Sequence, residues 1–135
     1  MIVLDSSFII AFQNRRDVHH AAASRVMPDL IGGGFGRLLL LEYVFLEVVT
    51  VLLARCGHAI AVDTADTLLN AHEVDFLPCS ELFQSALDIF RTTNPARLSF
   101  TDAAIVAAAR QHETEFVATF DDGFRRIEGL TLVPV

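Results

Sequence analysis

The chain has 135 residues, of which 53% are hydrophobic, and carries a formal net charge of −7. This length predicts one domain over residues 1–135, with a core that needs no disulfide or metal to hold it. All ten basic residues are arginines, which argues against a broad surface for a phosphate backbone. Any nucleic acid must be held through a bound cation and a few local arginines. The surplus of apolar residues predicts a homodimer or a second bound chain.

The cysteines and the apolar segments predict a cytoplasmic protein. Cys56 and Cys79 lack metal-ligand spacing, so we expect two buried, small apolar side chains in a reducing compartment. No signal peptide is expected, because Asp5 interrupts the first apolar run too early. The apolar stretch 38–54 contains Glu42 and Glu47, each costing about 2.5–3.5 kcal/mol at the centre of a bilayer. No membrane span is therefore expected.

The chain begins with an apolar run, Ile2 to Leu4, that stops at Asp5 and is followed at once by the pattern of a helix. A short continuous apolar run is typical of a parallel strand buried on both faces, and Ser6 or Ser7 can cap the helix. Asp5 then lies at the carboxyl end of the first strand, the edge of an open α/β sheet where ligands bind. The alternative is that Asp5 serves only as a helix cap.

Helices and strands alternate along the rest of the chain. A helix over 18–27, with solvated His19 and His20 near its start, is followed by a flexible break from Pro28 to Gly36. Strands are predicted over 37–41, 74–77, 115–119 and 130–133, and helices over 42–55, 60–71, 81–91 (capped by Ser80), 101–112 and 122–127. The segment 93–100 contains Asn94-Pro95 and is a connection of roughly 27 Å when extended. Five alternating strands predict a three-layer α/β/α fold with a five-stranded parallel sheet.

Three further acids occupy positions at which a ligand can be held. Glu47 lies in the second turn of the helix 42–55, and helical side chains tilt toward the N-terminus, so its carboxylate can reach the strand-end edge. Asp102 opens the helix 101–112 and Asp121 follows the strand 115–119, with Asp122 as an alternative fourth acid. Taken singly, these acids are equally explained by a solvent-facing stripe, a helix dipole or a cap.

The parallel topology brings Asp5, Glu47, Asp102 and Asp121 to one edge of the sheet. Two bare carboxylates 4 Å apart repel by about 4 kcal/mol at an intermediate dielectric constant, so a positive group must lie between them. The sequence has no lysine, and no arginine directly adjoins any of the four acids. All-oxygen coordination favours Mg²⁺ or Mn²⁺, and such an ion can activate water and bind a phosphodiester oxygen. This pattern predicts metal-assisted hydrolysis of a nucleic acid.

The sequence resembles PIN-domain ribonucleases, in particular the VapC-type toxins of bacterial and archaeal toxin–antitoxin pairs. The resemblance spans the chain and is carried by Ile2-Val3-Leu4-Asp5-Ser6-Ser7, Tyr43-Val44-Phe45-Leu46-Glu47-Val48-Val49, Ser99-Phe100-Thr101-Asp102-Ala103 and Ala118-Thr119-Phe120-Asp121. It implies that the four acids are the metal-binding and catalytic set, supported by Ser6, Thr101 or Thr119. It also implies Mg²⁺- or Mn²⁺-dependent endonucleolytic cleavage of RNA, dimerisation, and inhibition by a small antitoxin protein. One or two metal ions are compatible with this set.

Other classes of protein share parts of this pattern. Phospho-acceptor domains and haloacid-dehalogenase-like phosphatases also place an aspartate after the first strand, but they rely on a lysine that this sequence lacks. A catalytically silent PIN-fold binding module and a housekeeping RNA-processing nuclease are the two alternatives that the sequence leaves open. Phosphate contacts or ordinary solvated positions are expected for Arg15, Arg16, Arg91, Arg97, Arg125 and Arg126.

Overall fold

A computed structural model describes residues 1–93 and 98–135. Five parallel strands form one sheet in the order β3-β2-β1-β4-β5. The strands are β1 (Ile2–Leu4), β2 (Leu38–Leu41), β3 (Val74–Leu77), β4 (Phe116–Ala118) and β5 (Thr131–Val133). The predicted three-layer α/β fold with a five-stranded parallel sheet is therefore confirmed. Residues 94–97 of the predicted connection 93–100, Arg97 among them, lie outside the described residues, and the next helix already begins at Phe100.

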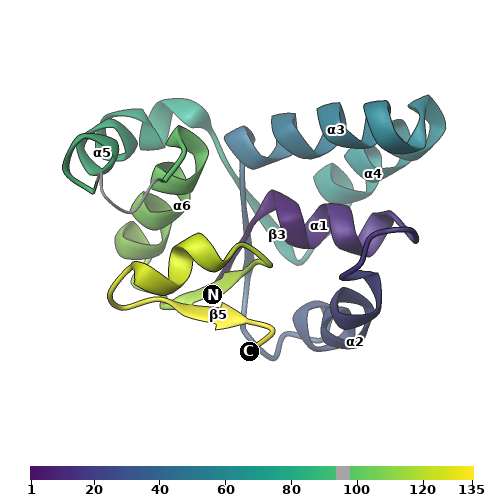
Figure 1. Ribbon diagram of the computed structural model, residues 1–135, viewed down its shortest axis with the longest axis horizontal. Helices are drawn as coiled ribbons and strands as arrows, with labels where there is room; N and C mark the ends of the chain where they lie inside the picture. Colours follow the sequence, from purple (N-terminus) through teal and green to yellow (C-terminus); the bar gives the residue numbers. More distant parts are fainter. Residues whose placement is uncertain (94–97) are drawn as a thin grey trace.

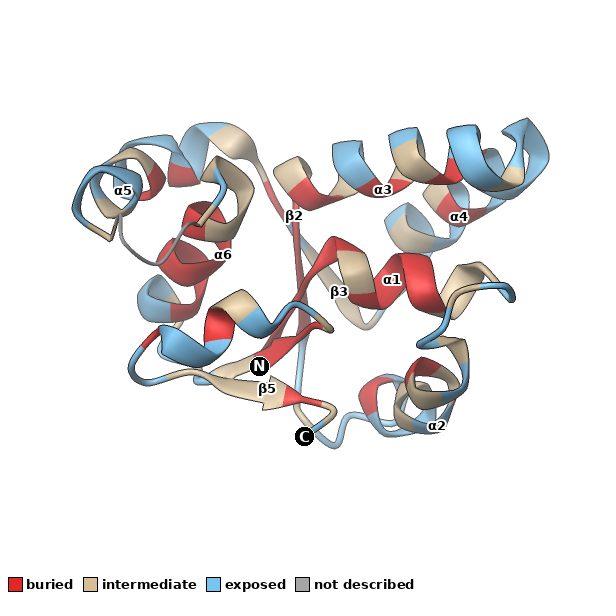
Figure 2. Cartoon of the chain, viewed as in Figure 1, coloured by how far each residue is buried: buried red, intermediate tan, exposed pale blue. Residues whose placement is uncertain are grey.

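The two central strands are apolar because they are covered on both faces. Every residue of β1 and β2 is buried, and Leu40 and Leu41 have no exposed surface. Helices lie on both sides of the sheet (Figure 1), and Figure 2 shows their buried sides turned toward it. These helices are α1 (Ser6–Gln13), α2 (His20–Ile31), α3 (Glu42–Cys56), α4 (His58–Asn70), α5 (Cys79–Thr92), α6 (Phe100–Gln111) and the short 3₁₀ helix η1 (Asp122–Arg126).

Helix α6 is buried around its whole circumference. All seven residues from Ala103 to Ala109 are buried, which agrees with a helix that is apolar on every side. It packs most extensively against α5 and also contacts β1. Its N-terminus, with Asp102 in the first turn, is thereby fixed close to the carboxyl end of the central strand.

Tertiary contacts overrule several local predictions. Helix α2 continues through Pro28 to Ile31, because Leu30 is completely buried in the core and its packing offsets the proline's cost of about 3 kcal/mol. Helix α5 begins at Cys79 and not after a Ser80 cap, since the carboxylate of Glu42 on α3 accepts a hydrogen bond from the Cys79 N–H at 2.9 Å. The prediction of a break at Pro28 and of a Ser80 cap was wrong.

Three side chains also differ from expectation. His20 is not solvated, since its Nδ1 lies 2.8 Å from the carbonyl oxygen of Ala11. Cys56 and Cys79 are free thiols of intermediate exposure, because both lie at helix ends and not in the core. Within the described residues, none of the helices combines the length and the apolar character needed to cross a bilayer.

Candidate functional site

Asp5 is the buried acid at the carboxyl end of the central strand. Its side chain is 4% exposed and caps α1 by accepting the Ser6 N–H at 2.8 Å, so Asp5 and not Ser6 or Ser7 is the N-cap. The hydroxyls of Ser7 and Thr119 approach the other carboxylate oxygen at 2.9 and 2.6 Å. Thr119 can do so because β4 pairs with β1 in register, which places the residues after both strands side by side. The capping role and a site role are thus compatible in the same residue.

The surroundings of Asp5 act on its pKa in opposite directions. Burial raises the pKa most strongly, and the hydrogen bonds from Thr119, Ser7 and the Ser6 N–H lower it. The negative charge of Asp121 raises it further, and the net result is a raised pKa. A cation beside Asp5 would favour the ionised form, because it offsets both the lost hydration and the repulsion.

Glu47 on α3 reaches the same edge from another layer of the fold. The Ser6 hydroxyl donates a hydrogen bond to the Glu47 carboxylate and lies 3.5 Å from Asp5 Oδ1, so this serine stands between the two acids. Glu47 is exposed, whereas Asp5 is buried. The site therefore contains one buried acid that hydrogen bonds hold in place, Asp5, and one solvent-exposed acid, Glu47.

Asp102 is held by a reciprocal cap at the start of α6. The Ser99 N–H donates to Asp102 Oδ2 at 3.1 Å, and the Asp102 N–H donates to Ser99 Oγ at 3.1 Å. Burial raises the pKa of Asp102 to about 6 and outweighs the lowering by the two hydrogen bonds with Ser99, while the charges of Asp5 and Asp121 raise it further. The sequence prediction missed Ser99, although Ser-x-x-Asp ahead of an apolar run is a recognisable capping pattern. Among the described hydrogen bonds, none involves the hydroxyl of Thr101.

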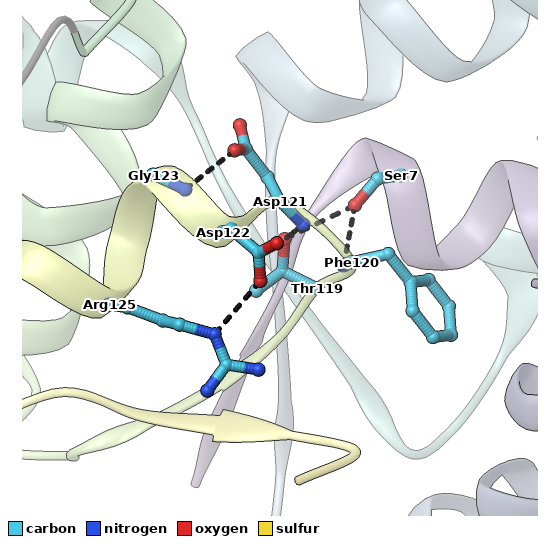
Figure 3. Close-up of polar contacts among 7 residues, drawn as sticks. All are labelled: Ser7, Thr119, Phe120, Asp121, Asp122, Gly123 and Arg125. Atoms are coloured by element: carbon cyan, nitrogen blue, oxygen red, sulfur yellow. Dashed lines mark hydrogen bonds and ion pairs between the residues drawn. The ribbon is translucent and has the colours of Figure 1, made fainter.

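The two acids after β4 point in different directions (Figure 3). Asp121 Oδ1 accepts the Gly123 N–H at 2.8 Å, and its charge raises the pKa values of both Asp5 and Asp102. Asp122 instead forms an exposed ion pair with Arg125 at 2.8 Å. Of these two neighbours, Asp121 is the one whose charge acts on the buried acids.

Ser7 joins the first helix to the link between β4 and η1. Its hydroxyl donates to Asp5. It also accepts the Phe120 N–H at 3.0 Å and lies 3.2 Å from the Thr119 hydroxyl (Figure 3). Thr119 Oγ1 in turn accepts the Asp121 N–H at 2.9 Å. The sequence prediction named Ser7 only as a possible helix cap, because its partners Thr119 and Phe120 lie more than a hundred residues away along the chain.

A pocket of about 320 Å³ opens beside these acids. Ser6, Glu47 and Asp121 line one part of it, and Arg55 contributes a cationic side chain from the end of α3. Arg16, expected either to contact a phosphate or to be solvated, donates from its guanidinium to the Arg55 carbonyl oxygen at 2.9 Å, and Arg125 pairs with Asp122. Arg55 was not among the predicted contacts.

The donor chemistry of the edge fits a hard divalent cation. In the described part of the chain, no three His, Cys, Asp or Glu side chains stand close enough together to form a ready-made metal cluster. Mg²⁺, however, commonly uses one or two protein carboxylates and keeps several waters. The charge of Asp121 raises the pKa values of both Asp5 and Asp102, and the hydroxyl oxygens of Ser6 and Thr119 bind to the carboxylates of Glu47 and Asp5.

These features define an α/β domain with an acidic site at the carboxyl edge of a parallel sheet. The family model of the PIN domain matches residues 2–130, and the chain belongs to this family. Membership of the PIN family supports a nuclease, which is a hydrolase. PIN nucleases generally use divalent metal ions.

Solved structures agree with this family. One of them is VapC20 of Mycobacterium tuberculosis, described as a Sarcin-Ricin loop cleaving toxin. It is 26% identical to this chain, the alignment covers 95% of both chains, and the TM-score is 0.84. VapBC2 of Rickettsia felis bound to a promoter DNA fragment is 14% identical over 98% of this chain and 97% of the other, with a TM-score of 0.71. FitAcB of Neisseria gonorrhoeae is 17% identical over 98% and 96%, with a TM-score of 0.64.

The likenesses to VapBC2 and FitAcB, at 14% and 17% identity, show the fold alone. No curated protein matches the chain significantly. The resemblance to VapC-type PIN ribonucleases that the sequence predicts is confirmed by the family match and by the structural likeness to VapC20.

Proposed function

We propose that this chain is a single-domain, Mg²⁺- or Mn²⁺-dependent endoribonuclease and the toxin of a type II toxin–antitoxin pair. The observation that carries the proposal is the buried carboxylate of Asp5, which ends the central strand and whose pKa is raised by burial and by the charge of Asp121. Such a group is stabilised in its ionised form by a divalent cation. RNA as the substrate is supported by the likeness to VapC20, described as a Sarcin-Ricin loop cleaving toxin.

In this proposal Asp5, Glu47, Asp102 and Asp121 hold the ion. When bound, Mg²⁺ or Mn²⁺ lowers the pKa of a water molecule and polarises the phosphodiester. The hydroxyls of Ser7 and Thr119 fix the orientation of the Asp5 carboxylate, and the Ser6 hydroxyl fixes that of Glu47. Glu47 is exposed, and in this proposal its carboxylate accepts a proton from the attacking water. In this proposal Thr101 and Asp122 have only a supporting role, since no described hydrogen bond involves the Thr101 hydroxyl and the Asp122 carboxylate pairs with Arg125.

A small antitoxin and a second copy of the chain are the proposed partners. VapBC2 and FitAcB are among the solved structures with the same fold. Large apolar side chains are exposed on α3, α4 and α5, which supports a covered surface. They are Leu46, Leu53, Ile60, Val62, Leu69, Phe83 and Phe90. We place this activity in the cytoplasm, where RNA and an antitoxin are both present.

The proposal is tested by incubating the purified chain with a panel of stable RNAs in Mn²⁺ or in EDTA. We expect cleavage only with the metal, and a loss of about 100-fold or more in Asp5→Asn. Asp66→Asn, which removes an exposed charge on α4, is the matched control and should cleave normally. Cleavage that survives in EDTA or in Asp5→Asn would overturn the assignment.

The same experiments separate the alternatives. A silent binding module would leave every RNA intact under all conditions. A toxin should arrest growth on expression and be relieved by a co-expressed small protein encoded beside it, whereas a housekeeping nuclease should be tolerated.

A further inference from the structure

The pocket beside the acids extends well beyond them, toward the turn between α1 and α2. Its far part is lined by Asp17 and His19 of this turn, by Phe120 and by Arg55. Glu47 and Arg55 are eight residues apart on α3, which corresponds to about 12 Å along the helix axis. A ligand that touches both parts is therefore longer than a single phosphate group. None of these far residues is needed to hold a metal ion.

Aromatic rings form the floor of this far part. The His19 ring stacks on Phe120 with a centroid distance of 4.4 Å and an angle of 5°, and Phe120 stacks on Phe8 at 5.7 Å and 11°. Phe8 is completely buried, so the series of rings is anchored in the core, while His19 at its end is exposed. The exposed His19 ring, supported on Phe120, is therefore the aromatic surface that the ring series offers to the pocket.

The turn that carries His19 is fixed in place. The carboxylate of Asp17 accepts the His19 N–H at 2.8 Å, and the adjoining His20 is bound through Nδ1 to the Ala11 carbonyl oxygen. A side chain held in this way loses little freedom when a ligand binds, which increases the affinity of a contact. His19 is thus preorganised and still accessible.

Arg55 supplies the charge that the rest of the pocket lacks. It is exposed at the end of α3, and its backbone carbonyl accepts a hydrogen bond from Arg16. Among the described residues that line the pocket, Arg55 is the cationic side chain; Asp17 lies in the same far part, and Glu47 and Asp121 lie in the other part. A flat stacking surface beside one arginine matches an unpaired nucleobase and its neighbouring phosphate, because single strands are bound by stacking and by backbone charge.

We propose that the far part of the pocket is a nucleotide subsite for single-stranded RNA, with an unpaired base stacked on His19 and a flanking phosphate bound by Arg55. This inference rests on the proposed function, because it assigns where the substrate lies beside the metal. It predicts that cleavage occurs in unpaired RNA, since a base locked in a duplex cannot lie on the ring. His19 and Arg55 bind substrate and position it; they do not take part in the bond cleavage.

The test measures binding of a fluorescein-labelled, mixed-sequence RNA dodecamer by anisotropy, in the cleavage-deficient Asp5→Asn background with Mg²⁺. We expect His19→Ala to weaken binding about fivefold or more, and His19→Phe to restore it to within about twofold. Arg55→Ala should reduce the slope of log K against log salt by about 0.7, the value for one phosphate contact on a single strand. His72→Ala is the matched control, since this exposed histidine precedes β3 at the opposite edge of the sheet.

Two further measurements separate binding from folding and catalysis. Urea unfolding of each variant identifies any loss of stability, and His19→Phe, which keeps an aromatic ring on Phe120, separates stacking from the imidazole itself. With the Mn²⁺-dependent enzyme, His19→Ala should raise KM more than it lowers kcat. The same dodecamer annealed to its complement should bind at least about fivefold more weakly than the free strand.

Equal RNA affinity of His19→Ala and the parent protein, or equal affinity for strand and duplex, would overturn the subsite. If His19→Ala leaves RNA binding unchanged but prevents association with a co-purifying protein, the surface belongs to a protein partner and the inference is wrong. Failure of the nuclease assignment can be distinguished from failure of the subsite. In the first case Asp5→Asn and the parent protein would cleave RNA equally, whatever the binding measurements show for His19→Ala and Arg55→Ala.

Discussion

Replacing Asp102 by asparagine should stabilise the metal-free protein near neutral pH and at the same time abolish cleavage. Burial, with help from the charges of Asp5 and Asp121, raises the pKa of Asp102 to about 6. Asparagine has the same shape, and its amide oxygen can still accept the Ser99 N–H, so the cap of α6 is kept. The substitution therefore removes a repelling charge without removing the local structure. It also removes an ionised oxygen ligand from the proposed metal site.

The sign and size of this effect follow from the pKa. A pKa raised from 3.8 to about 6 means that the folded protein holds the Asp102 proton more tightly than the unfolded chain does. The resulting stabilisation is fully present below about pH 4 and is lost as the pH rises through 6. The pKa difference corresponds to about 3 kcal/mol, and solvent screening of this partly exposed group reduces the expected effect to about 1–2 kcal/mol. Asp102→Asn should not show this loss.

Urea unfolding in EDTA from pH 4 to pH 8 measures the effect directly. Between pH 4 and pH 8 the free energy of unfolding of the parent protein should lose about 1–2 kcal/mol that Asp102→Asn keeps. The control Asp66→Asn, which removes an exposed charge, should behave like the parent. Saturating Mg²⁺ should then stabilise the parent by about 2.7 kcal/mol at one hundred times the dissociation constant, and the variant by less. A variant with the same pH dependence as the parent, or with lower stability at pH 8, would refute this reasoning.

Two further predictions concern the neighbours of Asp5 and the fourth acid. Thr119→Val removes the hydroxyl that donates to Asp5 at 2.6 Å and lowers the pKa of Asp5. We expect the free energy of unfolding to fall by about 1–3 kcal/mol, and by more at pH 8 than at pH 4, where Asp5 is protonated. Urea unfolding at both pH values measures this, and equal stability of the variant and the parent would contradict it. Asp121→Asn should lower metal-dependent cleavage about tenfold or more, whereas Asp122→Asn, whose carboxylate is occupied by Arg125 in an exposed ion pair, should cleave within about twofold of the parent in an initial-rate assay. Equal losses in the two variants would show that the orientation of these acids does not decide their roles.

Much of the sheet could be predicted because its signals are local. The continuous apolar runs at β1 and β2 indicate strands buried on both faces, and both strands are completely buried. The predicted range of β3, 74–77, agrees residue for residue with Val74–Leu77. Parallel pairing then follows from the alternation of strands and helices, and it aligns the strand ends that carry Asp5 and Asp121.

The errors lie where a distant contact outweighs a local preference. Pro28 normally ends a helix, yet α2 continues because Leu30 is buried in the core. The first N–H groups of α5 need an acceptor, and Glu42 supplies it from another helix, so no local cap marks the true start. Neither contact leaves a recognisable trace in the neighbouring residues.

The sequence by itself therefore determined which carboxylates stand at the ends of strands and helices, because hydrophobic periodicity and short breaks record those positions locally. The tertiary structure alone decided which groups meet there. Ser7 and Thr119 are 112 residues apart, and only the register of β1 against β4 brings their hydroxyls to within 3.2 Å. The stacking of His19 on Phe120 likewise depends on side-chain packing between separate segments, which no local pattern encodes.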